Sequence, residues 1–198
     1  MNYINQYIEE TKQIMEKIDK NSIKKIVDLI DKVREEKGRI FFIGSGGGSG
    51  NATHAVNDFR KIAGIESYTP TDNVSELTAR TNDEGWDSVF VEYLKTSKLN
   101  KNDMVFVLSV GGGNEEKNIS VNIIKALKYA KNKGAKICGI VGRDGGYTKK
   151  VSDAVVLIPT INKKTITPHT EAYQGVICHL IVSHPKILKN EMKWESTK

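Results

Sequence analysis

The sequence predicts an α/β domain, in which a doubly wound, mainly parallel five-stranded sheet carries helices on both faces and follows an N-terminal helical pair. Short apolar segments recur along the chain, as in strands buried inside a parallel sheet, and segments with helical apolar spacing alternate with them. With 198 residues, of which 38% are hydrophobic and 27% charged, the chain suits one domain. We expect a single domain over residues 1–198, with N-terminal helices in 1–37 and the α/β core in 38–198.

The elements follow in a regular order. Apolar residues have helical spacing over residues 2–37, with Asn21-Ser22 as the predicted break between two helices and Gly38 as the end of the second. Strands are predicted at residues 39–43, 67–70, 104–109, 136–141 and 154–159. Helices are predicted at residues 52–63, 119–131 and 169–183, and the lysine-rich end, 186–198, is predicted as a short exposed helix.

Composition and charge argue against several classes of protein. The chain has 30 Lys and Arg against 24 Asp and Glu, but this excess is spread out with no block of like charge, which argues against nucleic-acid binding. Cys138 and Cys178 lie far apart in apolar stretches, which indicates buried thiols in a reducing compartment. The N-terminal residues lack a signal-peptide pattern, and no run approaches the roughly 18 apolar residues of a membrane span. We therefore expect a cytoplasmic protein.

Two glycine clusters, Gly44–Gly50 and Ser109–Asn114, follow predicted strands at the edge where such sheets bind ligands. Glycines let backbone N–H groups approach an anion closely, and a helix N-terminus adds partial positive charge, so a phosphate is the expected ligand. A P-loop is excluded because neither cluster has its lysine, and a dinucleotide fingerprint lacks its third glycine at Ser49. Tight turns without a ligand remain an alternative interpretation.

Two predicted helices carry polar pairs. His54 and Asp58 share one helix face, and the last helix carries Glu171 and His179, which are about 12 Å apart along the helix axis. Two helices that each supply a carboxylate and an imidazole can form a divalent-metal site or an acid–base pair. On spacing alone, a His–Asp pair on one helix face is more often a surface hydrogen bond.

The run Gly44–Asp58 resembles the sedoheptulose 7-phosphate isomerase (phosphoheptose isomerase) family of SIS-domain proteins, which has a Gly-Asn-Gly-Gly-Ser loop followed by His and Glu. Asn82-Asp83-Glu84-Gly85 is similar to the family's Asn-Asp-x-Gly segment, and Gly142–Gly146 is similar to its Gly-Lys-Asp-Gly-Gly turn. The last helix, with Glu171 and His179, resembles the stretch where the family has Gln and His. The resemblance covers nearly the whole chain.

The resemblance implies a flavodoxin-like SIS fold and a homotetramer with active sites between subunits, in which residues 1–37 serve oligomerisation. It implies conversion of sedoheptulose 7-phosphate to glycero-manno-heptose 7-phosphate, an early step toward nucleotide-activated heptose. It implies one zinc ion per site, with ligand positions at His54, Asp58, Glu171 and His179. The implied substrate contacts are Ser45, Gly46, Gly47, Asn82, Asp83, Ser109, Val110, Gly111, Asn114 and Glu171.

The chain departs from the family pattern at three places. Asp58 replaces Glu and is shorter by roughly 1.5 Å. Glu171 replaces Gln and adds a negative charge, which favours a dication. Ser109–Asn114 replaces a Ser-Thr-Ser-Gly-Asn-Ser loop, so backbone N–H groups take the place of hydroxyls. We still expect a phosphosugar as the substrate, although the sugar can differ from that of the family.

We expect aldose–ketose isomerisation through an enediol, with Asp58 as the base at carbon and His179 as the group that moves the oxygen proton. A metal on the four ligand positions would instead polarise the carbonyl, and Asp58 cannot be a free base and a tight ligand at once. The sequence leaves both schemes open. Alternative hypotheses are a non-catalytic phosphosugar-binding SIS protein (a regulator or replication-initiation partner), an isomerase of another ketose phosphate, and a lyase of amino-sugar ethers.

Overall fold

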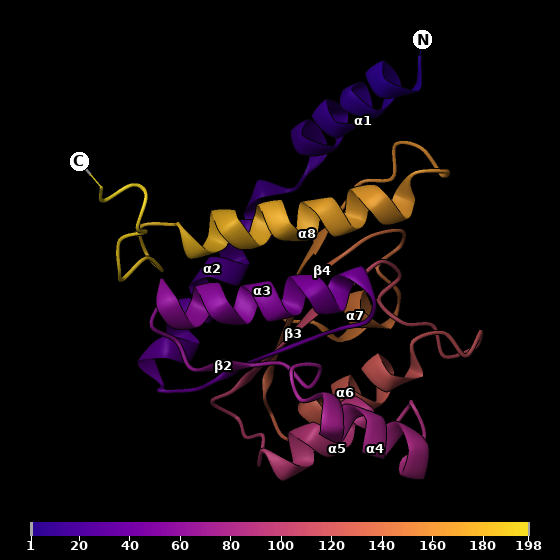
Figure 1. Ribbon diagram of the computed structural model, residues 1–198, viewed down its shortest axis with the longest axis vertical. Coiled ribbons are helices and arrows are strands. Elements are labelled where there is room, and N and C mark those ends of the chain that lie inside the picture. The colour runs from indigo at the N-terminus through magenta and orange to yellow at the C-terminus, as the bar shows by residue number, and fades with distance from the viewer. Residues whose placement is uncertain (1, 198) are drawn as a thin grey trace.

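The structure is a computed structural model that describes residues 2–197, and its five strands form one parallel sheet in the order β2-β1-β3-β4-β5 (Figure 1). The chain begins the sheet at β1 and then builds outward on both sides, so the strand order reverses between β1 and β3. This arrangement confirms the predicted doubly wound α/β class. The strands are β1 (Ile40–Gly44), β2 (Ser67–Tyr68), β3 (Met104–Ser109), β4 (Lys136–Val141) and β5 (Ala154–Leu157).

Helices cover both faces of the sheet, and the side chains of β1 divide the core between them. Phe42 faces the layer of α2, α3 and α8 and packs against Phe59 and Phe106, with ring centroids 5.1 and 5.2 Å away. Phe41 faces the opposite layer, which includes Phe90. Burial on both faces explains why β1 is continuously apolar. The helices are α1 (Tyr3–Lys17), α2 (Lys20–Glu35), α3 (Gly47–Lys61), α4 (Val74–Glu84), α5 (Val89–Thr96), α6 (Val121–Asn132), α7 (Gly146–Val151) and α8 (Ile166–Val182).

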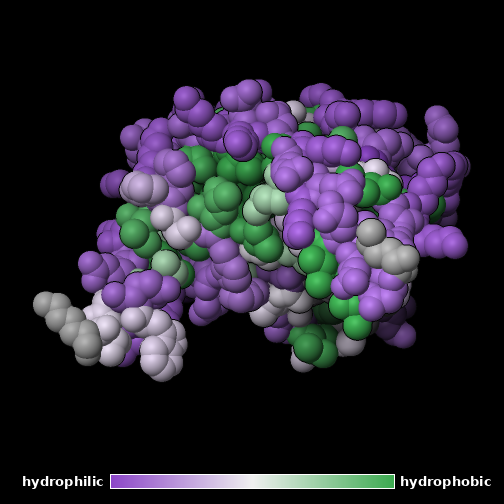
Figure 2. Space-filling model, turned by 90° about the horizontal axis from the view of Figure 1, so that it is seen from above, coloured by the Kyte–Doolittle hydropathy of each residue, from purple (hydrophilic) through white to green (hydrophobic). Residues whose placement is uncertain are grey.

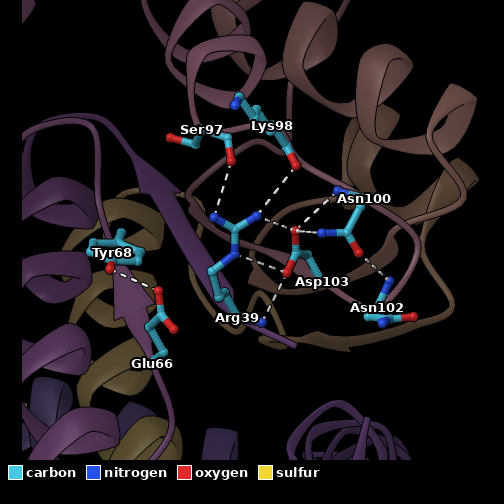
Figure 3. A network of polar contacts seen from close by, with 8 residues as sticks. All are labelled: Arg39, Glu66, Tyr68, Ser97, Lys98, Asn100, Asn102 and Asp103. Atoms are coloured by element: carbon cyan, nitrogen blue, oxygen red, sulfur yellow. Dashed lines mark hydrogen bonds and ion pairs between the residues drawn. The ribbon is translucent and has the colours of Figure 1, made fainter. Parts of the chain in front are cut away.

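A polar network fastens the starts of β1 and β3 at the N-terminal edge of the sheet (Figure 3). The buried Asp103 carboxylate accepts hydrogen bonds from Arg39 Nη2 at 2.8 Å and from the backbone N–H groups of Arg39 and Asn100, both at 3.0 Å. The Arg39 guanidinium also donates to the carbonyl oxygen of Ser97 at 3.0 Å. The hydrogen bond to Asp103 raises the pKa of Arg39.

Several predicted boundaries were wrong. The break between the first two helices lies at Ile18-Asp19 and not at Asn21-Ser22, because the Asp19 side chain caps α2 by accepting from Asn21 N at 2.9 Å. The helix predicted from residue 52 begins at Gly47. The helices α4, α5 and α7 were not predicted, and α4 buries none of its residues, so it lacks an apolar stripe.

The predicted helix at 186–198 was also wrong, since residues 186–197 form turns and irregular chain and Lys198 lies outside the described residues. The expectation of buried thiols is confirmed: Cys138 and Cys178 are buried and free, and burial raises the pKa of Cys178 to about 12. Within residues 2–197, no helix has the length and apolar character needed to cross a membrane.

Candidate functional site

Three of the predicted site residues converge on the outer surface of the α3–α8 layer. Helices α3 and α8 pack side by side (Figure 1), and His54 and Asp58 of α3 meet His179 of α8. Asp58 Oδ2 lies 3.3 Å from His54 Nε2 and 3.4 Å from His179 Nε2, and the two Nε2 atoms are 3.4 Å apart. We call these three residues the His–Asp–His cluster.

Local structure holds the cluster in place. The spacing of four residues puts His54 and Asp58 one turn apart on α3, whose buried side includes Phe59. Near the start of α3, Asn51 Nδ2 donates to the carbonyl oxygen of Glu171 and to Gln174 Oε1, both at 2.9 Å. These bonds fix the start of α3 against α8, so the two imidazoles approach from fixed helices.

The two histidines and the carboxylate differ in exposure. The His54 and His179 side chains are 57% and 58% exposed, whereas the Asp58 side chain is 12% exposed. Asn57 Nδ2 donates to Asp58 Oδ1 at 2.9 Å, which orients the carboxylate and leaves Oδ2 facing the imidazoles. An oriented carboxylate beside two accessible imidazoles is suited to moving protons on a bound substrate.

The same donor set fits a divalent metal ion. One atom from each cluster residue lies within 4.8 Å of the others, and two imidazole nitrogens with one carboxylate oxygen match a catalytic zinc site that keeps an open position. A cavity of about 430 Å³ adjoins the cluster on its open side. Its lining residues are His54, Asp58, Ile62, His179, Leu180, Val182, Ser183, Met192 and Glu195.

The structure does not bring Glu171 to the cluster within one chain. Glu171 precedes His179 by eight residues on α8, which is about 12 Å along the helix. Its carboxylate lies instead over the first turn of α3, where a Cβ added at Gly47 would overlap it. A negative charge at a helix N-terminus is favourable, so Glu171 belongs with the first glycine cluster.

The first glycine cluster turns the chain from β1 into α3. Ser45, Gly46 and Gly47 are exposed, and Gly46 has φ 58° and ψ −126°, a backbone conformation that favours glycine. Gly48 packs so closely on the carbonyl oxygen of Leu108 that a Cβ would clash. The first cluster therefore lies against the end of β3, beside the second cluster, as the predicted sheet edge requires.

The second glycine cluster is fixed by its carbonyl groups. The carbonyl oxygen of Gly112 accepts from Thr148 N at 2.9 Å and from Thr148 Oγ1 at 2.8 Å, and Ser109 Oγ accepts from Gly112 N at 3.1 Å. The N–H groups of Gly111 and Gly113 donate to no atom of residues 2–197. A loop with oriented carbonyls and free N–H groups is suited to an anion.

Of the remaining predicted contacts, Val110 and Asn114 belong to the second glycine cluster, whereas Asn82 and Asp83 lie elsewhere in the fold. Val110 accepts from Gly142 N at 3.1 Å through its carbonyl oxygen, and Asn114 forms a bridge with Ile119. Asn82 and Asp83 are exposed on α4, and Asn82 Nδ2 donates to Asp83 Oδ1 at 2.7 Å. Helix α4 lies on the opposite side of the sheet from α8 (Figure 1), so one chain does not join this pair to the cluster.

Sequence reasoning missed two features of the α8 region. Met192 and Glu195 line the cavity beside the cluster, and no periodic pattern in the C-terminal tail could have placed them there. His169 is buried, and its Nε2 lies 2.9 Å from Glu10 Oε2 on α1. Glu10 also accepts from Asn162 and Thr165, and these hydrogen bonds, that of Asn162 first, lower the pKa of Glu10 to about 2.

Comparisons with known proteins agree with the predicted family and fold. A family model described as SIS domain matches residues 3–142. A Helicobacter pylori (strain Shi470) protein named phosphoheptose isomerase is 28% identical over 163 residues, covering 80% of this chain and 81% of the relative. A Thermoplasma volcanium protein named probable phosphoheptose isomerase is 30% identical over 186 residues, covering 91% of each.

A solved structure shows the same fold. The structure of a phosphoheptose isomerase from Francisella tularensis matches with a TM-score of 0.79 at 20% identity, covering 92% of this chain and 97% of that one. The family model spans more than half of the chain, and the T. volcanium relative matches it nearly end to end. The chain therefore belongs to the SIS domain family and, within it, to the phosphoheptose isomerase family.

Proposed function

We propose that the protein is a phosphosugar isomerase that interconverts an aldose phosphate and a ketose phosphate. The names of the relatives support this class, and sedoheptulose 7-phosphate to glycero-manno-heptose 7-phosphate is the reaction that we propose first. The observation that carries the proposal is the convergence of His54, Asp58 and His179 within 4.8 Å beside an open cavity. Such a group of bases is what proton transfer at a carbonyl-bearing sugar requires.

In the proposed reaction, the carbon next to the carbonyl loses a proton, an enediol forms, and the neighbouring carbon gains a proton. Asp58 Oδ2 is the base at carbon, since Asn57 holds the other carboxylate oxygen. His179 moves the proton between the two substrate oxygens, and its exposed ring can reach a substrate in the cavity. His54, 3.3 Å from Asp58, supports the same carboxylate.

A second scheme uses zinc, which His54, Asp58 and His179 would hold. Bound zinc supplies a Lewis acid that polarises the carbonyl and stabilises enediolate charge. Asp58 is then a ligand, and the base at carbon must be a different group. The two schemes differ in one measurable respect, because only the zinc scheme loses activity when a chelator removes the metal.

We propose that the substrate phosphate binds the second glycine cluster, through the free N–H groups of Gly111 and Gly113 and the hydroxyl of Ser109. The Glu171 carboxylate already lies at the first turn of α3 and would repel a phosphate there. Ser45, Gly46 and Gly47 with Glu171 are then left to contact sugar hydroxyls. This division assigns the phosphate to the second glycine cluster and sugar hydroxyls to the first.

We propose a homotetramer whose sites lie between subunits. Within one chain, Asn82 and Asp83 lie on the far layer from the cluster, so a neighbouring copy must bring them to it. Seen from above, hydrophobic side chains gather on the side of α8 and α1 (Figure 2). Large exposed apolar residues of these helices are Tyr3, Ile4, Ile8, Met15, Val176 and Leu180. A cytoplasmic location remains a prediction.

The test is an activity screen of the purified protein on seven-, six- and five-carbon ketose phosphates, combined with elemental metal analysis and chelator treatment. The expected result is turnover of a ketose phosphate, with the seven-carbon substrate fastest. Phosphosugar binding without turnover of any of them would contradict the isomerase and favour the non-catalytic alternative. Activity that survives chelation identifies the acid–base scheme, and activity lost on chelation and restored by zinc identifies the metal scheme.

A further inference from the structure

The turn between β4 and α7, residues 142–146, packs directly on the second glycine cluster. Tyr147 N, just after this turn, donates to the carbonyl oxygen of Gly113 at 2.8 Å. A Cβ added at Gly146 would lie 2.3 Å from the carbonyl oxygens of Gly111 and Gly113, so only glycine allows this close approach. The two loops are therefore held together at the carboxyl edge of the sheet.

Arg143 extends from this turn over the second glycine cluster. Its Cδ lies 3.9 Å from the position that a Cβ on Gly111 would take, which is ordinary van der Waals contact. The guanidinium follows Cδ directly, so it can reach a group that is bound to the free N–H of Gly111. Arg143 has φ 53°, a left-handed backbone conformation that glycine adopts more readily. A long basic side chain in this conformation, beside free N–H groups, points to a role in binding.

Arg143 is the one arginine whose side chain has no hydrogen-bond or ion-pair partner among residues 2–197. The chain has five arginines, and the other four each have a partner: Arg34, Arg39, Arg60 and Arg80. The adjacent carboxylate of Asp144 turns back on its own loop, where Oδ1 accepts from Gly146 N at 3.1 Å. Arg143 is also exposed, so its guanidinium is available to a ligand.

The start of α8 lies between two opposite charges at this edge of the sheet. Thr170 packs against Gly142, where an added Cβ would lie 2.3 Å from Thr170 Oγ1. Arg143 follows Gly142 in the chain and extends over the second glycine cluster, whereas Glu171 follows Thr170 and places its carboxylate over the first turn of α3. The second cluster therefore has the positive side chain beside it, and the first cluster has the negative one.

We infer that Arg143 binds the phosphate group of the substrate, together with the N–H groups of Gly111 and Gly113. The guanidinium presents N–H groups in a fork that matches two phosphate oxygens. With Arg143 attracting the phosphate and Glu171 repelling it, the two charges set the direction in which the substrate lies across the two glycine clusters. The inference rests on the proposed function, because it adds a residue to the proposed phosphate site.

The test compares steady-state kinetics on the preferred ketose phosphate in the parent and in three variants, Arg143→Gln, Arg143→Lys and Lys131→Gln. Lys131 is exposed in the last turn of α6, whose first turn adjoins the second glycine cluster, so it controls for the loss of one distant surface charge. We expect Arg143→Gln to raise KM about tenfold or more and to change kcat less than about threefold, since the lost contact binds ground state and transition state alike. Arg143→Lys keeps the charge without the fork and should raise KM about threefold.

A second readout does not depend on turnover. Isothermal titration calorimetry with inorganic phosphate measures the anion site directly, and Arg143→Gln should bind phosphate about tenfold more weakly than the parent. Lys131→Gln should change phosphate binding less than about twofold. Circular dichroism checks that each variant is folded.

Three results would overturn the inference. The first is a KM and a phosphate affinity in Arg143→Gln that match those of the parent. The second is an equal loss in Lys131→Gln, which would show an effect of net charge alone. The third is a fall in kcat with KM unchanged, which would place Arg143 outside ground-state binding of the phosphate.

Failure of the proposed function gives a different pattern. A parent that turns over no ketose phosphate but binds inorganic phosphate through Arg143 removes the isomerase and keeps the anion site. A parent that turns over a ketose phosphate with no dependence on Arg143 keeps the isomerase and removes the inference. A parent that neither turns over a ketose phosphate nor binds inorganic phosphate removes both.

Discussion

The Arg39–Asp103 network and the His–Asp–His cluster each join a carboxylate to basic side chains, yet they differ in how completely the carboxylate is satisfied. Asp103 is 1% exposed, and both its oxygens accept hydrogen bonds from Arg39 and Asn100. Asp58 has one oxygen oriented by Asn57, while the other faces two imidazoles that are more than half exposed. The closed network has no room for a ligand and serves stability, whereas the open cluster can exchange protons or hold a cation.

The largest expected effect is on activity at the open cluster. Asp58→Asn and His179→Gln should each lower kcat/KM on the preferred ketose phosphate by at least about 100-fold, because each removes a proton-transfer group or a metal ligand. The melting temperature of His179→Gln should change little, since the His179 side chain is 58% exposed. His184→Gln is the control, because His184 lies outside the cluster. Near-normal turnover in both cluster variants would refute the site assignment.

The next effect is on stability at the closed network. Asp103→Ala leaves the Arg39 guanidinium without its carboxylate and should lower the free energy of unfolding by about 3 kcal/mol, as for a broken buried ion pair. Urea denaturation measures this change. Activity per folded molecule should stay close to that of the parent. A loss of activity without a loss of stability would erase the distinction between the two regions.

Glu10 and His169 form a second closed pair and extend the comparison to pH. Hydrogen bonds, that of Asn162 first, lower the pKa of Glu10 from 4.5 to about 2 in the folded protein. Because the pKa of Glu10 is lower in the folded protein than in the unfolded chain, the ionised carboxylate stabilises the folded protein at a pH above the unfolded-state pKa. This contribution to the free energy of unfolding is lost as the pH falls from about 4.5 toward 2. The free energy of unfolding of the parent should therefore fall more steeply over this range than that of Glu10→Gln. Parallel curves for the two proteins would contradict the role of Glu10.

The smallest expected effect concerns Glu171, which is half-buried at the first turn of α3. Glu171→Gln removes the negative charge from a helix N-terminus and should let an anion approach it. Inorganic phosphate should then inhibit about threefold more strongly, which corresponds to a helix-terminus interaction of ordinary size. Glu191→Gln provides a control for the loss of one surface charge. Unchanged inhibition by phosphate would mean that Glu171 does not repel anions from the first turn of α3.

The elements that sequence patterns predicted are those with a strong apolar signal. Strand β1 is buried on both faces and is continuously apolar, so Ile40–Gly44 was predicted almost to the residue. Helix α4 buries none of its residues, and residues 186–197 are held by hydrogen bonds to the end of α3, so neither has a periodic pattern that identifies its structure. The periodic spacing of apolar residues reflects which side chains are buried, so segments that bury few side chains are not predicted from it.

The sequence by itself determined the sheet class, the two glycine clusters, the family and the pairing of His54 with Asp58, because each depends on residues that are neighbours in the chain. Only the tertiary structure decided that His179 joins this pair while Glu171 stays with Gly47. The physical reason is the rise of α8, which separates its two polar side chains by about 12 Å. The same packing decided that the tail brings Glu195 to the cavity, since contacts between distant segments depend on how the helices pack.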